Sequence, residues 1–277
     1  MTAYEIMVKT NHHIIKGGEL TEPQKANIVS QLLAARSDER TKQSFYKGVK
    51  YQNNIDNAGD VTGTYPGYYI PPYNGGKKYQ TIIPMSPKTH IFSANSYELE
   101  IMRILCLFAP DDPVVKDMAA KTLKRLKTAC FGNDCTIGEC FHSSLIALRF
   151  IAAAAPDDTI WINKLVDKIS ERIAEKLKGN NRVHGNLQWY YYLCLSELPY
   201  NTAEPELLKY KDELYARLMK SAVMNNESDK IHHPVLFCIL RNCLCRFPEY
   251  AYLKARQPYV SEKDGRLHFD VTLSLAK

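Results

Sequence analysis

The chain has 277 residues, of which 45% are hydrophobic and 24% are charged, and this composition excludes a largely disordered protein. There are 36 Lys and Arg residues against 30 Asp and Glu residues, and the net charge of +6 is spread along the chain without a basic block. No apolar run approaches the roughly 18 residues needed to cross a bilayer, and the first residues are polar and charged, so we expect a cytoplasmic protein without membrane association.

The first 92 residues predict helices followed by a long irregular segment. A helix is expected after Thr21, which can cap it, with Pro23 in its first turn. From Tyr51 to Phe92 the sequence is rich in proline, glycine and tyrosine, which prevents a long regular element. Long loops of this kind are often functional, and tyrosine rings can pack on a surface or hold a ligand. The candidate ligand-binding residues in this segment are Tyr65, Tyr68, Tyr69 and Tyr73.

Helical hairpins are predicted from residue 93 to residue 257. A proline recurs at roughly 45-residue intervals, the unit length of HEAT-like and armadillo-like arrays, at Pro110, Pro156, Pro199 and Pro248. Apolar or aromatic residues and cysteines stand eight and five positions before each proline, so one face of each first helix is expected to be buried. Each proline therefore marks the turn of a hairpin, because proline cannot continue the helix before it.

These units predict an all-α fold of stacked helical hairpins, closed either as a HEAT-like or armadillo-like superhelix or as an α/α toroid. Both arrangements present a concave surface, and a plain orthogonal bundle is the alternative. Asp264-Gly265, followed by alternating apolar residues, predicts a short C-terminal β-hairpin that caps the last unit. The expected parts are an irregular N-terminal segment (1–92), four hairpin repeats (93–257) and the cap (258–277).

The segment DCTIGECFHSSLIALR, residues 134–149, carries the strongest chemical signal. Thr136 and Glu139 fit a capping box, which predicts a helix start and needs no catalytic role for Glu139. Cys140 then lies in the first turn, where unpaired amides and the positive end of the helix dipole favour a thiolate. A thiol nucleophile also needs a base, and His184 of another repeat is the candidate.

The order Gly-x-Cys at a helix start, followed by a later histidine, resembles that of transglutaminases and papain-like proteases. Those families place the histidine on a β-strand, whereas HGNLQWYYYLCLSEL, which begins at His184, predicts a helix. The resemblance implies a cysteine-dependent hydrolase or acyltransferase that uses Cys140 and His184. A structural cysteine is the simpler interpretation.

Neither a metal nor a cofactor is expected. Cys130, Cys135, Cys140 and His142 form a cluster, but their spacing differs from the gaps of roughly two to four residues that are typical of structural zinc sites. No phosphate-binding loop or dinucleotide fingerprint is present. Four further cysteines lie in apolar helical runs and are expected to be reduced and buried, namely Cys106, Cys194, Cys238 and Cys243.

The favoured function is non-catalytic binding, in which a concave helical surface receives a peptide, a protein or a small polar ligand. The run from Trp189 to Tyr192 is too wide for one buried face, so some of its rings are expected to face outward. Nucleic-acid binding is a weaker alternative, because acidic residues interleave the basic ones outside the segment KTLKRLK. The candidate ligand-binding residues in the repeats are Trp189, Tyr190, Tyr192 and Arg149.

Overall fold

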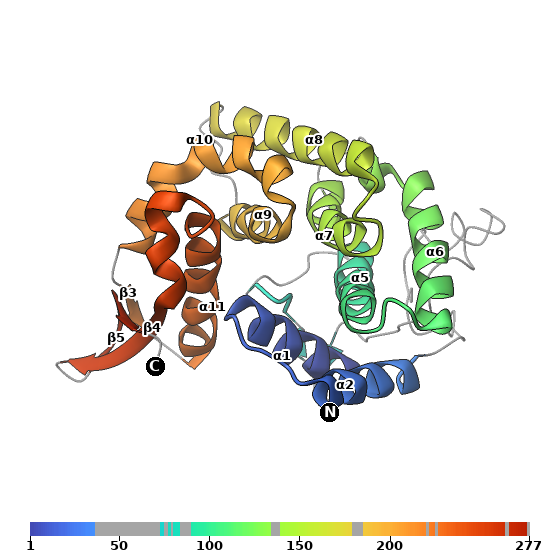
Figure 1. The fold of residues 1–277 in the computed structure, drawn as a ribbon, viewed down its shortest axis with the longest axis horizontal. Helices are drawn as coiled ribbons and strands as arrows, with labels where there is room; N and C mark the ends of the chain where they lie inside the picture. Colours follow the sequence, from blue (N-terminus) through green and yellow to red (C-terminus); the bar gives the residue numbers. More distant parts are fainter. Residues whose placement is uncertain are drawn as a thin grey trace. The chain divides into compact units, whose positions relative to one another are not determined.

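The computed structural model describes residues 1–36, 73–74, 77–78, 80–83, 90–133, 139–178, 185–219, 222–224, 227–263 and 266–275. These residues are mostly helical, which confirms the prediction of a helical protein (Figure 1). They form two compact units: unit 1 is Met1–Asn11 with Glu19–Val183, and unit 2 is His12–Gly18 with His184–Lys277. None of the described helices combines the length and apolarity needed to cross a membrane.

Unit 1 contains the larger part of α1 and two complete hairpins of the predicted repeat. Its elements are α1 (Ala3–Ile15, continuing into unit 2), α2 (Glu22–Ala34), β1 (Tyr73–Asn74), β2 (Lys77–Lys78), α5 (His90–Phe108), α6 (Pro113–Thr128), the 3-10 helix η2 (Cys130–Gly132), α7 (Glu139–Ala154) and α8 (Thr159–Lys178). The first helices α5 and α7 lie side by side, and each contacts the second helix of its own hairpin (Figure 1).

Unit 2 contains the two later hairpins and a small sheet. Its elements are α9 (Gly185–Glu197), α10 (Tyr200–Leu218), β3 (Ala222–Met224), α11 (Glu227–Leu244), the 3-10 helix η3 (Pro248–Ala255), β4 (Arg256–Lys263) and β5 (Arg266–Leu275). Here α11 contacts both α9 and α10, so the first helices again pack against each other. In the fourth hairpin, η3 takes the place of a second α-helix.

Each of the four repeat prolines lies outside the α-helices or at the start of the next element, as predicted. After Pro110, the carboxylate of Asp112 caps α6 by accepting from the amides of Val114 (2.8 Å) and Val115 (3.1 Å). After Pro156, the carboxylate of Asp158 accepts from the amide of Trp161 at 3.3 Å. Asp112 and Asp158 therefore each cap the start of a helix with a carboxylate oxygen.

The predicted stripe of buried side chains on the first helices is confirmed. The residues eight and five positions before the prolines are all at most 2% exposed, namely Met102, Leu148, Tyr191, Leu240, Leu105, Ile151, Cys194 and Cys243. Regular spacing alone located these positions, because an i, i+3 stripe faces one side of a helix. The four cysteines predicted to be buried are also buried.

The helix α1 was not predicted, although its end has a clear sequence signal. Gly17 has a φ of 81°, and its amide donates to the carbonyl of Ile14, while the amide of Gly18 donates to the carbonyl of His13. This pair of bonds is the Schellman motif, in which a glycine in the left-handed conformation ends a helix. By contrast, α2 begins as predicted, since Thr21 caps it in a capping box with Gln24.

A three-stranded antiparallel sheet follows in unit 2, with the order β3, β5, β4. In the pairing of β4 with β5, Lys263 lies opposite Arg266, and the intervening residues 264 and 265 lie outside the described part of the chain. The strand β3, which was not predicted, pairs with β5 by placing Ala222 opposite Phe269. Both β3 and β4 contact α11.

Candidate functional site

Cys140 is the second residue of α7 and is half-buried, as a position in the first turn predicts. Its sulfur lies 3.4 Å from the sulfur of Cys130, an exposed residue at the start of η2. Cys135, Thr136 and His184 lie outside the described residues, so the capping box and the pairing of Cys140 with His184 stay predictions. The described neighbour of Cys140 in this site is thus a second thiol.

The turn that carries Cys130 is fixed by contacts with both neighbouring helices. The indole Nε1 of Trp161, on α8, donates to the carbonyl of Gly132 at 2.6 Å. A Cβ atom at Gly132 would overlap the carbonyl of Leu126, so this close approach to the end of α6 requires glycine. The side-chain amide of Asn133 donates to the carbonyls of Lys127 (2.8 Å) and Ala129 (3.0 Å). These contacts hold Cys130 in a defined position.

Four of the other described thiols are buried, and a fifth is half-buried like Cys140. Cys106, Cys238 and Cys243 are buried, and burial raises the pKa of the Cys106 thiol to about 12 and also raises the pKa of the Cys238 and Cys243 thiols. Cys245 is half-buried, and burial raises its pKa as well. A thiol with a raised pKa is a poor nucleophile at neutral pH, because the thiolate is the reactive form.

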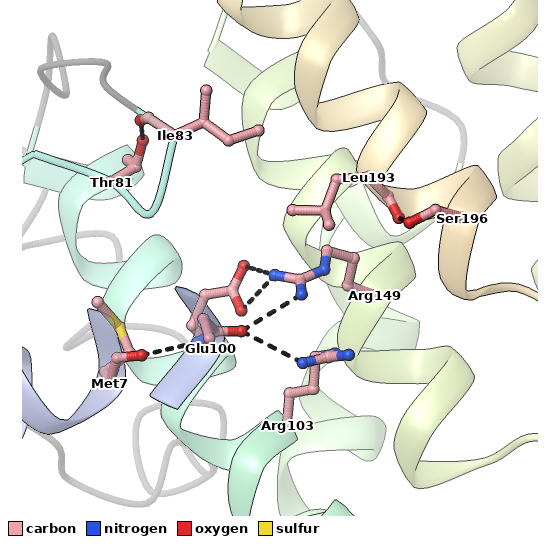
Figure 2. A network of polar contacts seen from close by, with 9 residues as sticks. Met7, Thr81, Ile83, Glu100, Arg103, Arg149, Leu193 and Ser196 are labelled. Carbon is pink, nitrogen blue, oxygen red and sulfur yellow. Dashed lines mark hydrogen bonds and ion pairs between the residues drawn. The ribbon is translucent and has the colours of Figure 1, made fainter. Parts of the chain in front are cut away.

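Arg149 lies in a buried ion pair and not on a surface. Its guanidinium donates to both carboxylate oxygens of Glu100, at 2.5 and 2.6 Å, and the two side chains are each 1% exposed (Figure 2). Asn11 accepts from Arg149 at 3.3 Å and from Arg103 at 3.2 Å through the same Oδ1. We call Asn11, Glu100, Arg103 and Arg149 the Glu100 cluster. Sequence spacing placed Arg149 correctly on the first helix but could not reveal its partner, which lies in another hairpin.

The arginines that recur seven positions before the repeat prolines share one kind of contact. In unit 1, Arg103 and Arg149 bind Asn11 of α1. In unit 2, Arg241 donates to the carbonyl of Lys16 at 3.2 Å, and its neighbour Asn242 donates to the carbonyl of Ile15 at 2.8 Å. In both units, therefore, the first helices use this position to hold the N-terminal segment of the chain.

The aromatic run on α9 is more buried than predicted. Tyr190, Tyr191 and Tyr192 are at most 1% exposed, and only Trp189 of the four is half-exposed. The prediction that the run needs outward-facing rings assumed that α9 has one buried face. Because α9 packs against both α10 and α11, it buries more than one face.

Trp189 belongs to a polar and aromatic network between α9 and α10, which we call the Trp189 cluster. The guanidinium of Arg217 lies over the indole at 5.7 Å, and the ring of Tyr192 meets it edge-on at 6.1 Å. Arg217 forms an ion pair with Glu213 at 2.7 Å. Gln188 completes the cluster by donating to the hydroxyl of Tyr192 (2.7 Å) and to Glu213 (3.2 Å) and by accepting from Arg217 (3.1 Å).

Burial and charge both act on the phenol of Tyr192. Loss of solvent raises its pKa, and the nearby carboxylate of Glu213 raises it further. Tyr192 therefore stays neutral and serves as a hydrogen-bond partner over the whole physiological pH range. Within the Trp189 cluster, Trp189 is half-exposed, and the side chains of Arg217 and Glu213 are 36% and 41% exposed.

The remaining predicted ligand-binding residues are four tyrosines of the N-terminal segment. Tyr65, Tyr68 and Tyr69 lie outside the described residues. Tyr73 lies in β1, where it pairs with Lys78 of β2. Within the described part of the chain, no group of three or more His, Cys, Asp or Glu residues is arranged to hold a metal ion.

Comparison with known proteins provides no relative, since no family model, no curated protein and no solved structure matches the chain.

Proposed function

We propose that the protein is a non-catalytic binding protein that holds a peptide or protein segment on a helical surface of unit 2 centred on Trp189. The observation that carries this proposal is the Trp189 cluster, in which a half-exposed indole contacts both a guanidinium and a second aromatic ring. Tryptophan, tyrosine and arginine are the residues that most often dominate the energy of protein interfaces. A rigid ring of this kind loses little conformational entropy on binding.

The cluster offers contacts of three kinds to a partner. An apolar side chain can pack on the indole edge, a carboxylate or carbonyl can accept from Arg217, and a donor can bind Glu213. Because Arg217 and Glu213 already bind each other and Gln188, these groups are held in place before a partner arrives. A segment with an apolar residue beside an acidic or amide residue fits this surface best.

We also propose that the hairpins stack in chain order, as a superhelix or as an α/α toroid. Supporting this, each unit repeats one packing pattern, in which first helices pack together and each touches the second helix of its hairpin. In such arrays, neighbouring hairpins bury the apolar face that a single hairpin leaves open. The binding surface would then lie on helices that the stack holds in place.

A peptide array probed with the full-length chain tests the binding proposal. Peptides that the wild-type chain selects are labelled, and their Kd is measured by fluorescence anisotropy for the wild type and for Trp189→Ala. Loss of an anchoring indole is expected to weaken binding at least about tenfold. The matched control is Tyr252→Ala, an exposed aromatic residue of η3, for which we expect a change of less than about twofold. Equal affinity of the wild type and Trp189→Ala, or no selected peptide, would contradict the proposal.

The two alternative functions make different predictions. Cysteine-dependent hydrolysis or acyl transfer requires that iodoacetamide label Cys140 faster than the other thiols at neutral pH. Nucleic-acid binding requires a salt-sensitive mobility shift with DNA or RNA. The basic side of α6 favours neither alternative, because Lys121 pairs with Asp117 at 2.7 Å and Lys127 pairs with Asp158 at 3.3 Å.

A further inference from the structure

Two thiols approach each other in unit 1 at a point that solvent can reach. The sulfurs of Cys130 and Cys140 are 3.4 Å apart, and Cys130 is exposed. A disulfide bond is about 2.05 Å long, so the sulfurs need to move together by only about 1.4 Å. Rotation of the two side chains can supply a movement of that size without refolding the backbone.

Packing contacts hold both elements that carry the two sulfurs, η2 with Cys130 and α7 with Cys140. The hydrogen bonds from Trp161 and Asn133 fix η2, as described above. On the other side, α7 packs against η2, and Phe141, next to Cys140, is completely buried. The pair is therefore a built feature of the fold, in which two anchored elements each present one sulfur.

We propose that Cys130 and Cys140 form a thiol–disulfide exchange site, which reacts reversibly with low-molecular-weight disulfides of the glutathione class. The inference is independent of the binding function proposed for unit 2. It assigns Cys140 a thiol partner, whereas the sequence suggested a histidine partner.

The reaction proceeds in two exchange steps. Cys130 loses its proton to water, and its thiolate attacks one sulfur of the small disulfide, forming a mixed disulfide and releasing one small thiolate. Cys140 then loses its proton to water, and its thiolate attacks the sulfur of Cys130, which forms the Cys130–Cys140 bond, breaks the mixed disulfide and releases the second small thiolate. Two electrons pass from the protein to the small disulfide, and the two released thiolates take up two protons.

Exposure decides the order of the steps. Cys130 is exposed and can be reached by a bulky disulfide, whereas Cys140 is half-buried. Cys140 is already beside Cys130, so its attack is intramolecular and does not depend on a second encounter. Cys130 is therefore the entry thiol and Cys140 the resolving thiol.

The experiment treats the full-length chain with glutathione disulfide, blocks the remaining thiols by alkylation, and locates the modified cysteines by peptide mass spectrometry. The same measurement is made on Cys130→Ser, Cys140→Ser and Cys135→Ser. Cys135→Ser is the matched control, because Cys135 lies between the two cysteines in sequence and the substitution leaves the proposed pair intact. Fragment ions from the wild type locate the bond even if one variant fails to fold.

We expect the wild type and Cys135→Ser to form a Cys130–Cys140 bond that dithiothreitol reverses. Cys140→Ser should stop at a glutathione adduct on Cys130 and release glutathione at least about tenfold more slowly than the wild type, since the intramolecular step is lost. Cys130→Ser should form no bond at Cys140.

A bond from Cys135 to either residue in the wild type, or oxidation of Cys130 no faster than that of Cys245, would overturn the proposal. Trp189→Ala should oxidise like the wild type.

Discussion

The Glu100 cluster of unit 1 and the Trp189 cluster of unit 2 are built from the same groups in opposite surroundings. Each joins an arginine, a glutamate and a side-chain amide by hydrogen bonds. In the first, Arg149 and Glu100 are each 1% exposed, whereas in the second, Arg217 and Glu213 are 36% and 41% exposed. Removing charges from water costs several kcal/mol, so a fully buried pair serves to fix helices in place. A half-exposed pair loses little hydration free energy on folding, and its charged groups remain accessible to a binding partner.

The buried pair should be the most sensitive to mutation. Arg149→Met leaves the carboxylate of Glu100 buried without its ion pair, which is expected to lower the free energy of unfolding by about 3 to 5 kcal/mol. Urea unfolding followed by circular dichroism measures this change. The double variant Arg149→Met with Glu100→Leu should recover most of the loss, since an apolar pair needs no charge compensation. If Arg149→Met were as stable as the wild type, the buried pair would not be more sensitive to mutation than the exposed pair, which would contradict this prediction.

Arg241 is 4% exposed and donates to two neutral oxygens, the carbonyl of Lys16 and the Oδ1 of Asn242. Arg241→Met is expected to lower the free energy of unfolding by about 2 kcal/mol, as loss of a charged hydrogen bond does. The same urea experiment tests this value. Asn242→Ala removes the bond to the carbonyl of Ile15 together with the oxygen that accepts from Arg241, and its expected loss is about 1 kcal/mol. No measurable loss of stability in Arg241→Met would contradict this prediction.

High pH should affect the Trp189 cluster through Tyr210, whose ring lies 5.6 Å from that of Tyr192. Burial raises the pKa of Tyr210 to about 12, above the usual value of 10.0. The unfolded chain therefore loses this proton first, so the contribution of Tyr210 to stability is complete below pH 10 and falls as the pH rises toward 12. The expected loss is about 1 kcal/mol at pH 11. Urea unfolding at pH 9 and pH 11 should show a smaller decrease for Tyr210→Phe than for the wild type; equal decreases would contradict this origin.

The smallest effect is expected at the exposed pair. Arg217→Gln should lower the free energy of unfolding by less than about 1 kcal/mol, because water screens a half-exposed ion pair. If the proposed function holds, the same variant should weaken the binding of selected peptides several-fold, as loss of an interface arginine does. Loss of stability comparable to that of Arg149→Met would remove the distinction between the two clusters.

The sequence predicted those parts of the fold that depend on local spacing. The stripe of Met102 and Leu105 follows from helix periodicity, and the turn at Pro110 follows because proline cannot continue the helix before it. The helix α1 was not predicted, although the pair Gly17-Gly18 is typical of the Schellman motif that ends this helix.

The clusters could not be predicted, since each depends on pairs that are far apart in sequence. Arg149 forms an ion pair with Glu100 of another hairpin, and the indole of Trp189 contacts the guanidinium of Arg217 on the next helix. Cys130 and Cys140 approach each other across ten residues, and Gly132 lets the turn after α6 lie close to the carbonyl of Leu126. Periodicity identifies the buried face of a helix but does not identify the residue opposite. Among the predicted ligand-binding residues, Trp189 is therefore favoured because it is half-exposed, which the sequence alone does not reveal.

The chain contains two tryptophans, and they lie in different units, Trp161 in unit 1 and Trp189 in unit 2. Trp161 is 7% exposed, and Trp189 is half-exposed beside a guanidinium, so their fluorescence should differ in colour and in access to quenchers. Replacing either one by phenylalanine leaves a single emitter that reports on one unit. Unfolding curves recorded from the two single-tryptophan chains coincide if the units unfold as one cooperative body and separate if each unit melts independently.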